Sequence, residues 1–251
     1  MSQAAILPRR ERPSIAYHRS AGRAPGVVFM GGFRSDMTGS KALALEAFCR
    51  ARGQAFLRFD YSGHGQSEGA FTDGTIASWL DDSLDAFDQL TEGGQIVVGS
   101  SMGGWIALLV ALARPDRTAG LVGIAAAPDF TEELMWRNMA PPVRQALLRH
   151  GVIWRPSAYG DGPYAITRAL IDEGRRHLLL GGPIAIHCPV RLIHGRQDPD
   201  VPWQTAERLA EKLESKDVKV ILVEQGGHRL SDPADIELIQ AQVAELSDLA
   251  A

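Results

Sequence analysis

The stretch Gly99-Ser100-Ser101-Met102-Gly103 lies between an apolar run, Gln95-Ile96-Val97-Val98, and a run of helix-forming residues, Trp105-Ile106-Ala107-Leu108-Leu109. A serine with a glycine two positions before it and another two positions after it, on a turn from a strand to a helix, is the GxSxG pattern of a nucleophile elbow. The turn holds the serine in strained backbone geometry, and the glycines let strand and helix pass close together. The pattern predicts that Ser101 is the nucleophile of a hydrolase.

The neighbouring hydroxyl, Ser100, does not fit this pattern. Centring the motif on Ser100 would put Val98 and Met102 at positions that require glycine. We therefore interpret Ser100 as a structural hydrogen-bonding group. GxSxG also occurs by chance in ordinary turns, but the strand before it and the helix after it favour the elbow.

Around this turn, short apolar runs alternate with amphipathic segments. The alternation predicts an α/β protein whose mostly parallel central sheet is flanked by helices on both faces. A first strand is expected from residue 14, and the predicted buried strands are 27–30, 55–59, 96–98, 121–124, 190–193 and 218–223. The predicted helices are 41–52, 75–90, 102–114, 205–213 and 235–249.

The alternation stops between about residues 128 and 187, where no clear strand is found. This segment is rich in large apolar residues and proline: Trp136, Met139, Pro141, Pro142, Trp154, Pro156, Tyr159 and Tyr164. Ligands of open α/β sheets bind outside the carboxyl ends of the strands, an edge that such an insertion can cover. We predict one domain over residues 1–251 with a small cap at about 128–187, whose Trp136, Met139 and Trp154 contact substrate or form a core of their own.

Composition narrows the classes of partner. A chain of 251 residues with 45% hydrophobic content can bury one large core. Its formal net charge is −4 and no basic run stands out, so we expect a small-molecule partner and no nucleic acid. No apolar run is long enough for a membrane span. Oligomeric state does not follow from the sequence.

The start of the chain and the cysteines bear on location. Residues 1–26 lack the apolar stretch of a secretory signal. They are rich in arginine, as organellar presequences are, but Glu11 interrupts them and a strand is predicted soon after. Cys49 and Cys188 have no CxxC spacing, which fits a reducing compartment. We therefore expect a cytoplasmic protein.

A serine hydroxyl needs a base within hydrogen-bond reach and an acid that holds this base in the right tautomer. Of the seven histidines, His228 is best placed, because it follows the last predicted strand through Glu224-Gln225-Gly226-Gly227 and so lies at the same sheet edge as Ser101. His194 also ends a strand, and His64 lies in a glycine-rich loop. The others are interpreted as surface or core histidines: His18, His150, His177 and His187.

The predicted acid is Asp198, which comes directly after the penultimate strand. The resulting chain order of serine, aspartate and histidine is the one that accompanies a nucleophile elbow. Asp200 and Asp129 are alternatives, but both are more readily explained as turn or capping residues.

Preorganised donors must stabilise the negative oxygen that forms during attack. The amide of Met102, at the start of a helix, is one candidate. The second is expected in Met30-Gly31-Gly32-Phe33, where the glycines let the backbone turn toward the substrate and leave the Phe33 amide as the best donor. A plain glycine turn is the alternative interpretation.

With these residues assigned, the chain resembles the α/β-hydrolase superfamily over nearly its whole length, including the loop FDYSGHGQS at residues 59–67. More narrowly, it is similar to the subfamily of palmitoyl-protein thioesterases that also cleave acyl glucuronides. The resemblance rests on GSKA (39–42), RFDYSG (58–63), VGSSMGGW (98–105), IHCPVRLIHG (186–195) and GHRL (227–230). By motif, Ser101, Asp198 and His228 fall on the triad of that family.

Two features depart from the family. The turn Gly32-Phe33-Arg34-Ser35-Asp36 is more charged, so that Arg34 either favours an anionic substrate or pairs with Asp36, and we expect the ion pair. The cap shares less with the family than the core does, and acyl-chain preference depends on the cap. Gly32 and Arg34 are therefore added to the cap residues as candidates for substrate binding.

Together these observations predict a serine hydrolase that cleaves acyl thioesters or carboxylic esters through an acyl-enzyme, without a metal or an organic cofactor. S-palmitoyl groups and acyl glucuronides are substrates that the resemblance implies. The same triad serves other chemistries, so a hydrolase of carbon–carbon bonds or amides is an alternative. A non-catalytic ligand-binding module on the same fold is another.

Overall fold

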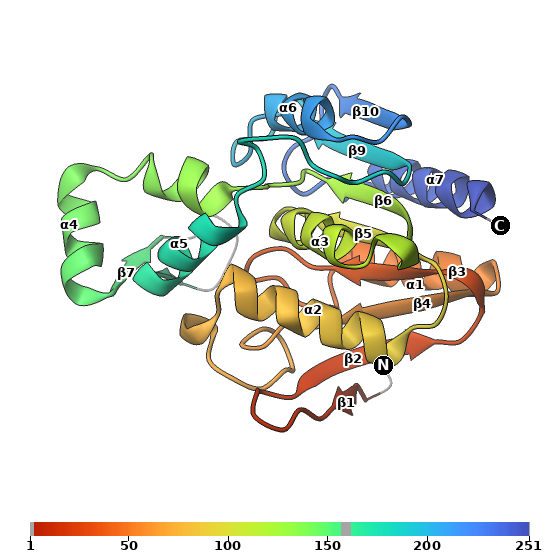
Figure 1. Cartoon of the computed structure of the whole chain (residues 1–251), viewed down its shortest axis with the longest axis horizontal. Coiled ribbons are helices and arrows are strands. Elements are labelled where there is room, and N and C mark those ends of the chain that lie inside the picture. The colour runs from red at the N-terminus through yellow and green to blue at the C-terminus, as the bar shows by residue number, and fades with distance from the viewer. Residues whose placement is uncertain (1–2, 157–161, 251) are drawn as a thin grey trace.

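The computed structural model describes residues 3–156 and 162–250. Its central sheet has eight strands in the order β1-β2-β4-β3-β5-β6-β9-β10 (Figure 1). β2 is antiparallel to both of its neighbours, and the other strand pairs are parallel. The strands are β1 (Ala5–Leu7), β2 (Ile15–Ser20), β3 (Arg23–Met30), β4 (Gln54–Phe59), β5 (Gln95–Ser100), β6 (Thr118–Ile124), β9 (Val190–Gly195) and β10 (Val218–Val223).

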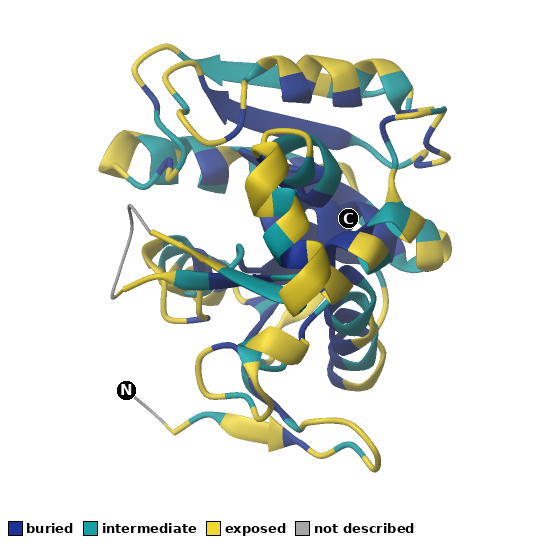
Figure 2. Ribbon diagram, turned by 90° about the vertical axis from the view of Figure 1, so that its left-hand side faces the viewer, coloured by how far each residue is buried: buried dark blue, intermediate teal, exposed yellow. Residues whose placement is uncertain are grey.

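Helices cover both faces of this sheet, because its central strands are apolar on both faces. Successive side chains of a strand point to opposite faces. In β3, Val28 and Met30 accordingly belong to the core that includes α2 (Ile76–Leu90), α3 (Met102–Ala113) and α6 (Gln204–Lys212). Val27 and Phe29 belong to a second core with α1 (Ser40–Ala51) and α7 (Pro233–Leu249). Figure 2 shows the buried strands between these two layers.

The predicted fold class is confirmed. Each predicted buried strand and helix overlaps an element of the structure, and the sheet is mostly parallel. The strand expected from residue 14 is β2. The sequence did not predict β1, which has only three residues, two of them exposed, at the edge of the sheet. Among the described residues, no helix combines the length and hydropathy that crossing a bilayer requires.

The segment between β6 and β9 stands apart from the sheet, beyond one end of it (Figure 1). It contains a π-helical turn (Thr131–Trp136), α4 (Pro141–His150), β7 (Val152–Arg155), β8 (Tyr164–Thr167) and α5 (Arg168–Gly174). β7 and β8 pair with each other, so the expectation of a segment without strands is wrong. Each strand has only four residues and pairs with one neighbour, which leaves neither a long apolar run nor a clear alternation. Tyr159 lies outside the described residues, and the division into one domain with a cap stays a prediction.

Candidate active site

Ser101 lies on a sharp turn between β5 and α3. Its backbone angles are φ 55° and ψ −120°, in a region that residues other than glycine rarely adopt. A Cβ atom at Gly99 would overlap the backbone of Gly103, and one at Gly103 would overlap the carbonyl groups of Met30 and Gly31. Strand and helix therefore pass too closely for any side chain at either glycine, as the motif predicts.

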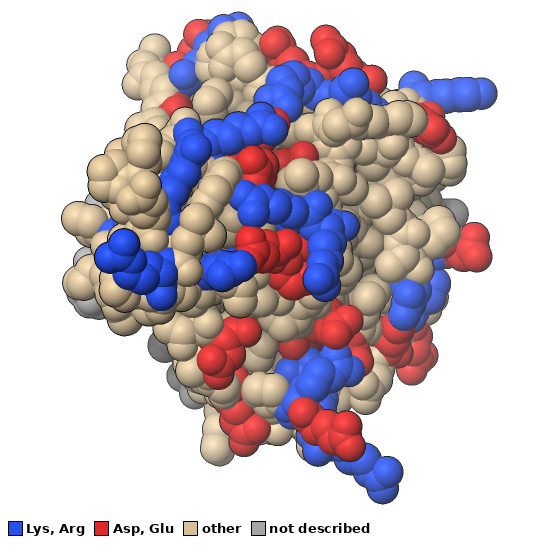
Figure 3. Space-filling view, turned by 60° about the vertical axis from the view of Figure 1, so that its left-hand side comes forward, with Lys and Arg blue, Asp and Glu red and all other residues tan. Residues whose placement is uncertain are grey.

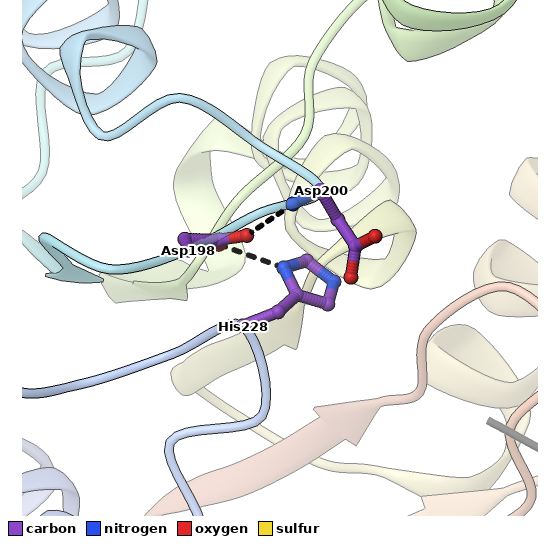
Figure 4. Close-up of side chains that lie close together, drawn as sticks. All are labelled: Asp198, Asp200 and His228. Carbon is purple, nitrogen blue, oxygen red and sulfur yellow. Dashed lines mark hydrogen bonds and ion pairs between the residues drawn. The ribbon is translucent and has the colours of Figure 1, made fainter. Parts of the chain in front are cut away.

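Two other loops bring polar side chains to this turn. His228, after β10, places Nε2 3.0 Å from Ser101 Oγ, and its Nδ1 is 2.8 Å from Asp198 Oδ2. Asp198 follows β9, and Figure 4 shows its carboxylate facing the imidazole. An Nδ1–H that donates to Asp198 leaves Nε2 free to accept the hydroxyl proton of Ser101. The structure thus brings together the three residues that the sequence singled out.

The carboxylate of Asp198 is fully buried and surrounded by donors. It accepts hydrogen bonds from the amides of Asp200 (2.8 Å) and Val201 (2.9 Å), and His194 Nε2 lies 3.2 Å away. Burial alone would raise its pKa, but the hydrogen bonds from His194, His228 and Val201 outweigh burial and hold the pKa of Asp198 well below its usual range. The group is therefore an anion at neutral pH.

The alternative bases and acids occupy other positions. His194 is buried, and its Nε2 lies 3.0 Å from the carbonyl oxygen of Val201. The same nitrogen contacts the carboxylate of Asp198 and not the hydroxyl of Ser101. Asp129 is buried, and its carboxylate accepts the amides of Leu179 (2.8 Å) and Leu180 (2.9 Å), a long-range bond to the backbone rather than the local turn or cap expected of it.

The predicted oxyanion donors flank Ser101. Met102 is the first residue of α3, so its amide has no acceptor within the helix. The loop after β3 approaches from the other side. A Cβ atom on Gly32 would lie 3.3 Å from the carbonyl oxygen of Ser100 and 3.4 Å from Ser101 Cβ. This loop turns sharply, since Ser35 N donates to Gly32 O (3.0 Å). The placement suits an oxyanion role for the Phe33 amide.

Three side chains that the sequence analysis left without a role hold this loop in place. Asp60 Oδ1 accepts the amide of Met37 (2.6 Å), and Tyr61 Oη donates to the carbonyl of Gly31 (3.2 Å). His64 Nε2 accepts the amide of Arg34 (3.2 Å). All three follow β4, within the FDYSGHGQS loop, in which the sequence pattern offers only His64, as an alternative base. Nothing local in that loop shows that its partner is a segment about thirty residues earlier.

The expected ion pair between Arg34 and Asp36 is wrong. The Arg34 guanidinium lies over the ring of Tyr164, 5.4 Å from its centroid. Asp36 Oδ1 instead accepts the amide (2.7 Å) and hydroxyl (2.5 Å) of Thr38. Aspartate readily bonds the backbone two residues on, and this local contact satisfies the carboxylate without the arginine.

The cap residues proposed for substrate contact differ in exposure. Met139 is buried in the main core, whereas the side chain of Trp154 is 63% exposed. Trp136 is half-buried, with the guanidinium groups of Arg144 and Arg175 at 5.3 and 4.7 Å from its ring centroid. Their role toward a substrate stays a prediction.

Asp198, Asp200 and His228 each place one ligand atom within 4.8 Å of the others, and are the one such group of His, Cys, Asp and Glu within the described part of the chain (Figure 4). Both oxygens of Asp198 already accept hydrogen bonds, and His228 Nδ1 donates one of them. Hydrogen bonding therefore accounts for the approach of Asp198 to His228. Cys49 and Cys188 are free thiols, and burial raises their pKa values to about 12 and about 11, so neither offers a thiolate at neutral pH.

Charged side chains do not segregate by sign on the face that Figure 3 shows. Acidic groups lie among the basic ones there, with apolar and neutral surface between them. A face with this mixture offers no continuous basic patch.

The known proteins to which this chain is similar are hydrolases. The model of the alpha/beta hydrolase family matches residues 27–237. The chain is 43% identical over 246 residues to the mitochondrial palmitoyl-protein thioesterase ABHD10 of Mus musculus, covering 97% of this chain and 82% of that protein. The Homo sapiens protein of the same name is 40% identical, with 97% and 79% covered. The structure of mouse alpha/beta hydrolase domain-containing protein 10 superimposes with a TM-score of 0.92 at 40% identity, covering all of both chains.

The names of these relatives also correct one expectation. They are mitochondrial proteins by name, which contradicts the cytoplasmic location predicted above. The features behind that prediction were the free cysteines and the lack of an apolar secretory stretch, and neither distinguishes the cytoplasm from another reducing compartment.

Proposed function

The chain belongs to the alpha/beta hydrolase family, and we propose from this premise that it is a serine hydrolase of acyl thioesters and carboxylic esters. The observation that carries the proposal is the series of contacts from Ser101 Oγ to His228 Nε2 (3.0 Å) and from His228 Nδ1 to Asp198 Oδ2 (2.8 Å). The relatives named palmitoyl-protein thioesterase favour thioesters as the first substrate class.

In the proposed acylation, Ser101 Oγ attacks the acyl carbonyl carbon while His228 Nε2 takes the hydroxyl proton. The anionic Asp198 stabilises the imidazolium that results and keeps its ring oriented. When the tetrahedral intermediate collapses, His228 gives the proton to the leaving sulfur or oxygen. The acyl group then remains on Ser101 as an ester.

The amides of Met102 and Phe33 are the proposed donors to the negative oxygen of the intermediate. Donors fixed before reaction need no reorganisation as charge develops, and each contributes about 10²- to 10³-fold in kcat in enzymes of this kind. The positive end of α3 adds to the effect at Met102.

Deacylation repeats the chemistry with water. His228 removes a proton from a water molecule as its oxygen attacks the acyl ester, and then returns the proton to Ser101 Oγ. The carboxylic acid leaves and the resting site is restored. Both half-reactions use the chain's own residues, without a redox step.

We place the acyl group between the loop after β3 and the cap. There the ring of Phe33 meets those of Phe130 (5.7 Å between centroids) and Tyr164 (5.9 Å), an apolar boundary that suits an acyl chain. Gly32 lies beside Ser101 in that loop, since a Cβ atom on it would be 3.4 Å from Ser101 Cβ. Arg34, over Tyr164, adds a cation at the same boundary and would suit an anionic leaving group such as a glucuronate.

The test is covalent labelling followed by kinetics. A fluorophosphonate probe should add one adduct to the intact mass of the wild-type protein and none to Ser101→Ala, which should also lose at least about 10³-fold in kcat. Matched acyl thioesters and oxygen esters of increasing chain length then rank the substrates.

Each result of this test is decisive for part of the proposal. Faster turnover of long-chain thioesters supports a depalmitoylase, and turnover of short oxygen esters alone leaves a carboxylesterase. Wild-type protein that takes up no adduct and turns over no ester contradicts the proposed function.

A further inference from the structure

His64 is a buried side chain near the candidate site that the proposed reaction does not use. It lies in the loop after β4, only 4% exposed, with its ring edge-on to three aromatic rings. The centroid distances are 5.5 Å to Tyr61, 5.2 Å to Phe71 and 5.2 Å to Trp79. Packing of this kind fixes the plane of the imidazole.

Two hydrogen bonds fix its tautomer. Nε2 lies 3.2 Å from the amide nitrogen of Arg34, which can only donate, so this nitrogen must carry a lone pair. Nδ1 lies 3.3 Å from the carbonyl oxygen of Ser62, which can only accept, so Nδ1 carries the proton. The ring is therefore neutral, and a protonated ring would lose the bond to Arg34.

Burial supports the neutral form. It lowers the pKa of His64 to about 4, against a smaller opposing effect of the Ser62 carbonyl. An exposed histidine begins to take up a proton just below neutral pH. The His64 ring stays neutral there and remains an acceptor for the Arg34 amide.

The bond reaches a strained part of the backbone. Arg34 has φ 61°, in the left-handed region, in the turn that Ser35 N closes onto Gly32 O (3.0 Å). A positive φ at the third position of a turn is normally supplied by glycine, and a residue with a Cβ atom is strained there. Phe33, whose amide is the proposed oxyanion donor, is the residue directly before Arg34 in that turn.

We propose that His64 is a positioning residue that holds the loop of Gly32, Phe33 and Arg34 in its oxyanion geometry by accepting the Arg34 amide. The inference rests on the proposed function, since it assigns the loop a role in binding the negative oxygen. Both ring nitrogens of His64 bond backbone groups, those of Arg34 and Ser62, so its effect on the loop passes through the backbone of Arg34.

Two variants separate the hydrogen bond from the packing. His64→Phe keeps a ring among Tyr61, Phe71 and Trp79 but removes the acceptor. His64→Gln removes the ring but restores an acceptor near the position of Nε2. Phe71→Leu loosens the packing of both His64 and Phe33, whose ring lies 5.0 Å from that of Phe71, without touching the bond, and serves as the packing control.

We expect His64→Phe to lose about 10- to 100-fold in kcat on p-nitrophenyl butyrate with KM changed less than about twofold, because a displaced donor weakens transition-state binding alone. His64→Gln should recover part of the loss, and Phe71→Leu should lose much less. Hydrogen exchange of the 31–37 peptide should accelerate in His64→Phe and slow again in His64→Gln.

Failure of this inference differs from failure of the proposed function. The inference is overturned if exchange in 31–37 is unchanged in His64→Phe, or if Phe71→Leu loses as much kcat as His64→Phe. A wild-type protein that neither labels nor hydrolyses esters defeats the proposed function, and the exchange experiment then still tests whether His64 holds the loop.

Discussion

At the scale of single residues, the candidate site depends on how fully Asp198 is hydrogen-bonded. Its two oxygens accept two backbone amides and two imidazoles, which keeps a buried carboxylate ionised. An ionised Asp198 orders His228 with Nδ1 protonated and Nε2 directed at Ser101. One buried charge thus determines both the orientation and the tautomer of the proposed base.

Asp198→Asn tests this dependence. The amide keeps the shape of the side chain but can present an N–H to His228, which favours the wrong tautomer and removes the negative charge. We expect kcat to fall by about 10³- to 10⁴-fold with little change in KM, measured on p-nitrophenyl butyrate. Circular dichroism should match that of the wild-type protein. Retention of more than about a tenth of the wild-type kcat would show that Asp198 does not act on His228 in this way.

The same scale shows what the sequence can and cannot predict about the site. Ser101, Asp198 and His228 were identifiable because each follows a predicted strand at its carboxyl end, where a parallel sheet gathers such residues. Whether they act as proposed is for the labelling experiment to decide. The role of His64 could not be predicted, because its bond to Arg34 joins loops after two different strands. The Arg34–Asp36 pair was wrongly expected because the local bond to Thr38 competes with it.

At the scale of elements, the crossing of β5, α3 and β3 is the most constrained part of the fold. Gly99 and Gly103 bring these backbones into contact, and Gly104 packs against Ala126 in the same way. Such contacts leave no room for a methyl group unless a strand or helix shifts. The short strands β7 and β8 are much less constrained by their sequence. Each pairs with only one neighbour, and neither has the long apolar run or the clear alternation that predicts a strand.

Gly103→Ala should therefore destabilise the protein by about 2 kcal/mol or more in urea unfolding, because the added methyl group meets backbone carbonyls that cannot rotate away. Gly181→Ala is the matched control. A Cβ atom at Gly181 meets nothing within 4 Å, and its backbone needs no positive φ, so we expect a change within about 0.5 kcal/mol. Equal stability of the two variants would mean that the elbow tolerates a wider crossing than the structure has.

At the scale of the whole molecule, aromatic rings connect α2, the loop after β3 and the cap. Phe33 contacts Phe71 and Trp79 on the α2 side, and Phe130 and Tyr164 on the cap side. His64 lies in the same cluster, so its protonation affects a contact shared by distant parts of the chain. The pH dependence of global stability can therefore report on this connection.

Several buried groups contribute to that dependence with different signs. Burial raises the pKa values of Asp60 and Asp129, so each destabilises the fold at neutral pH and the penalty is relieved as pH falls. The lowered pKa of Asp198 has the opposite effect, because its stabilisation is present above the ordinary pKa of 3.8 and is lost as pH falls below it. His64 titrates above that range, between its folded pKa of about 4 and its ordinary value of 6.5. The nearby acidic group is Asp82, whose carboxylate accepts the amide of Ser62, the residue that also bonds His64. Asp82 is in turn paired with Arg9.

For His64 the folded pKa of about 4 lies below the ordinary value of 6.5, so the unfolded chain binds the proton first as pH falls. Its stabilisation is complete above pH 6.5 and is lost progressively toward pH 4, by about 3 kcal/mol in all. The difference in unfolding free energy between wild type and His64→Phe isolates this contribution, because the aspartates are common to both. We expect wild type to lose its advantage over the variant between pH 7.5 and pH 4 in urea unfolding. A difference that stays constant over this range would mean that His64 is not held neutral by the fold.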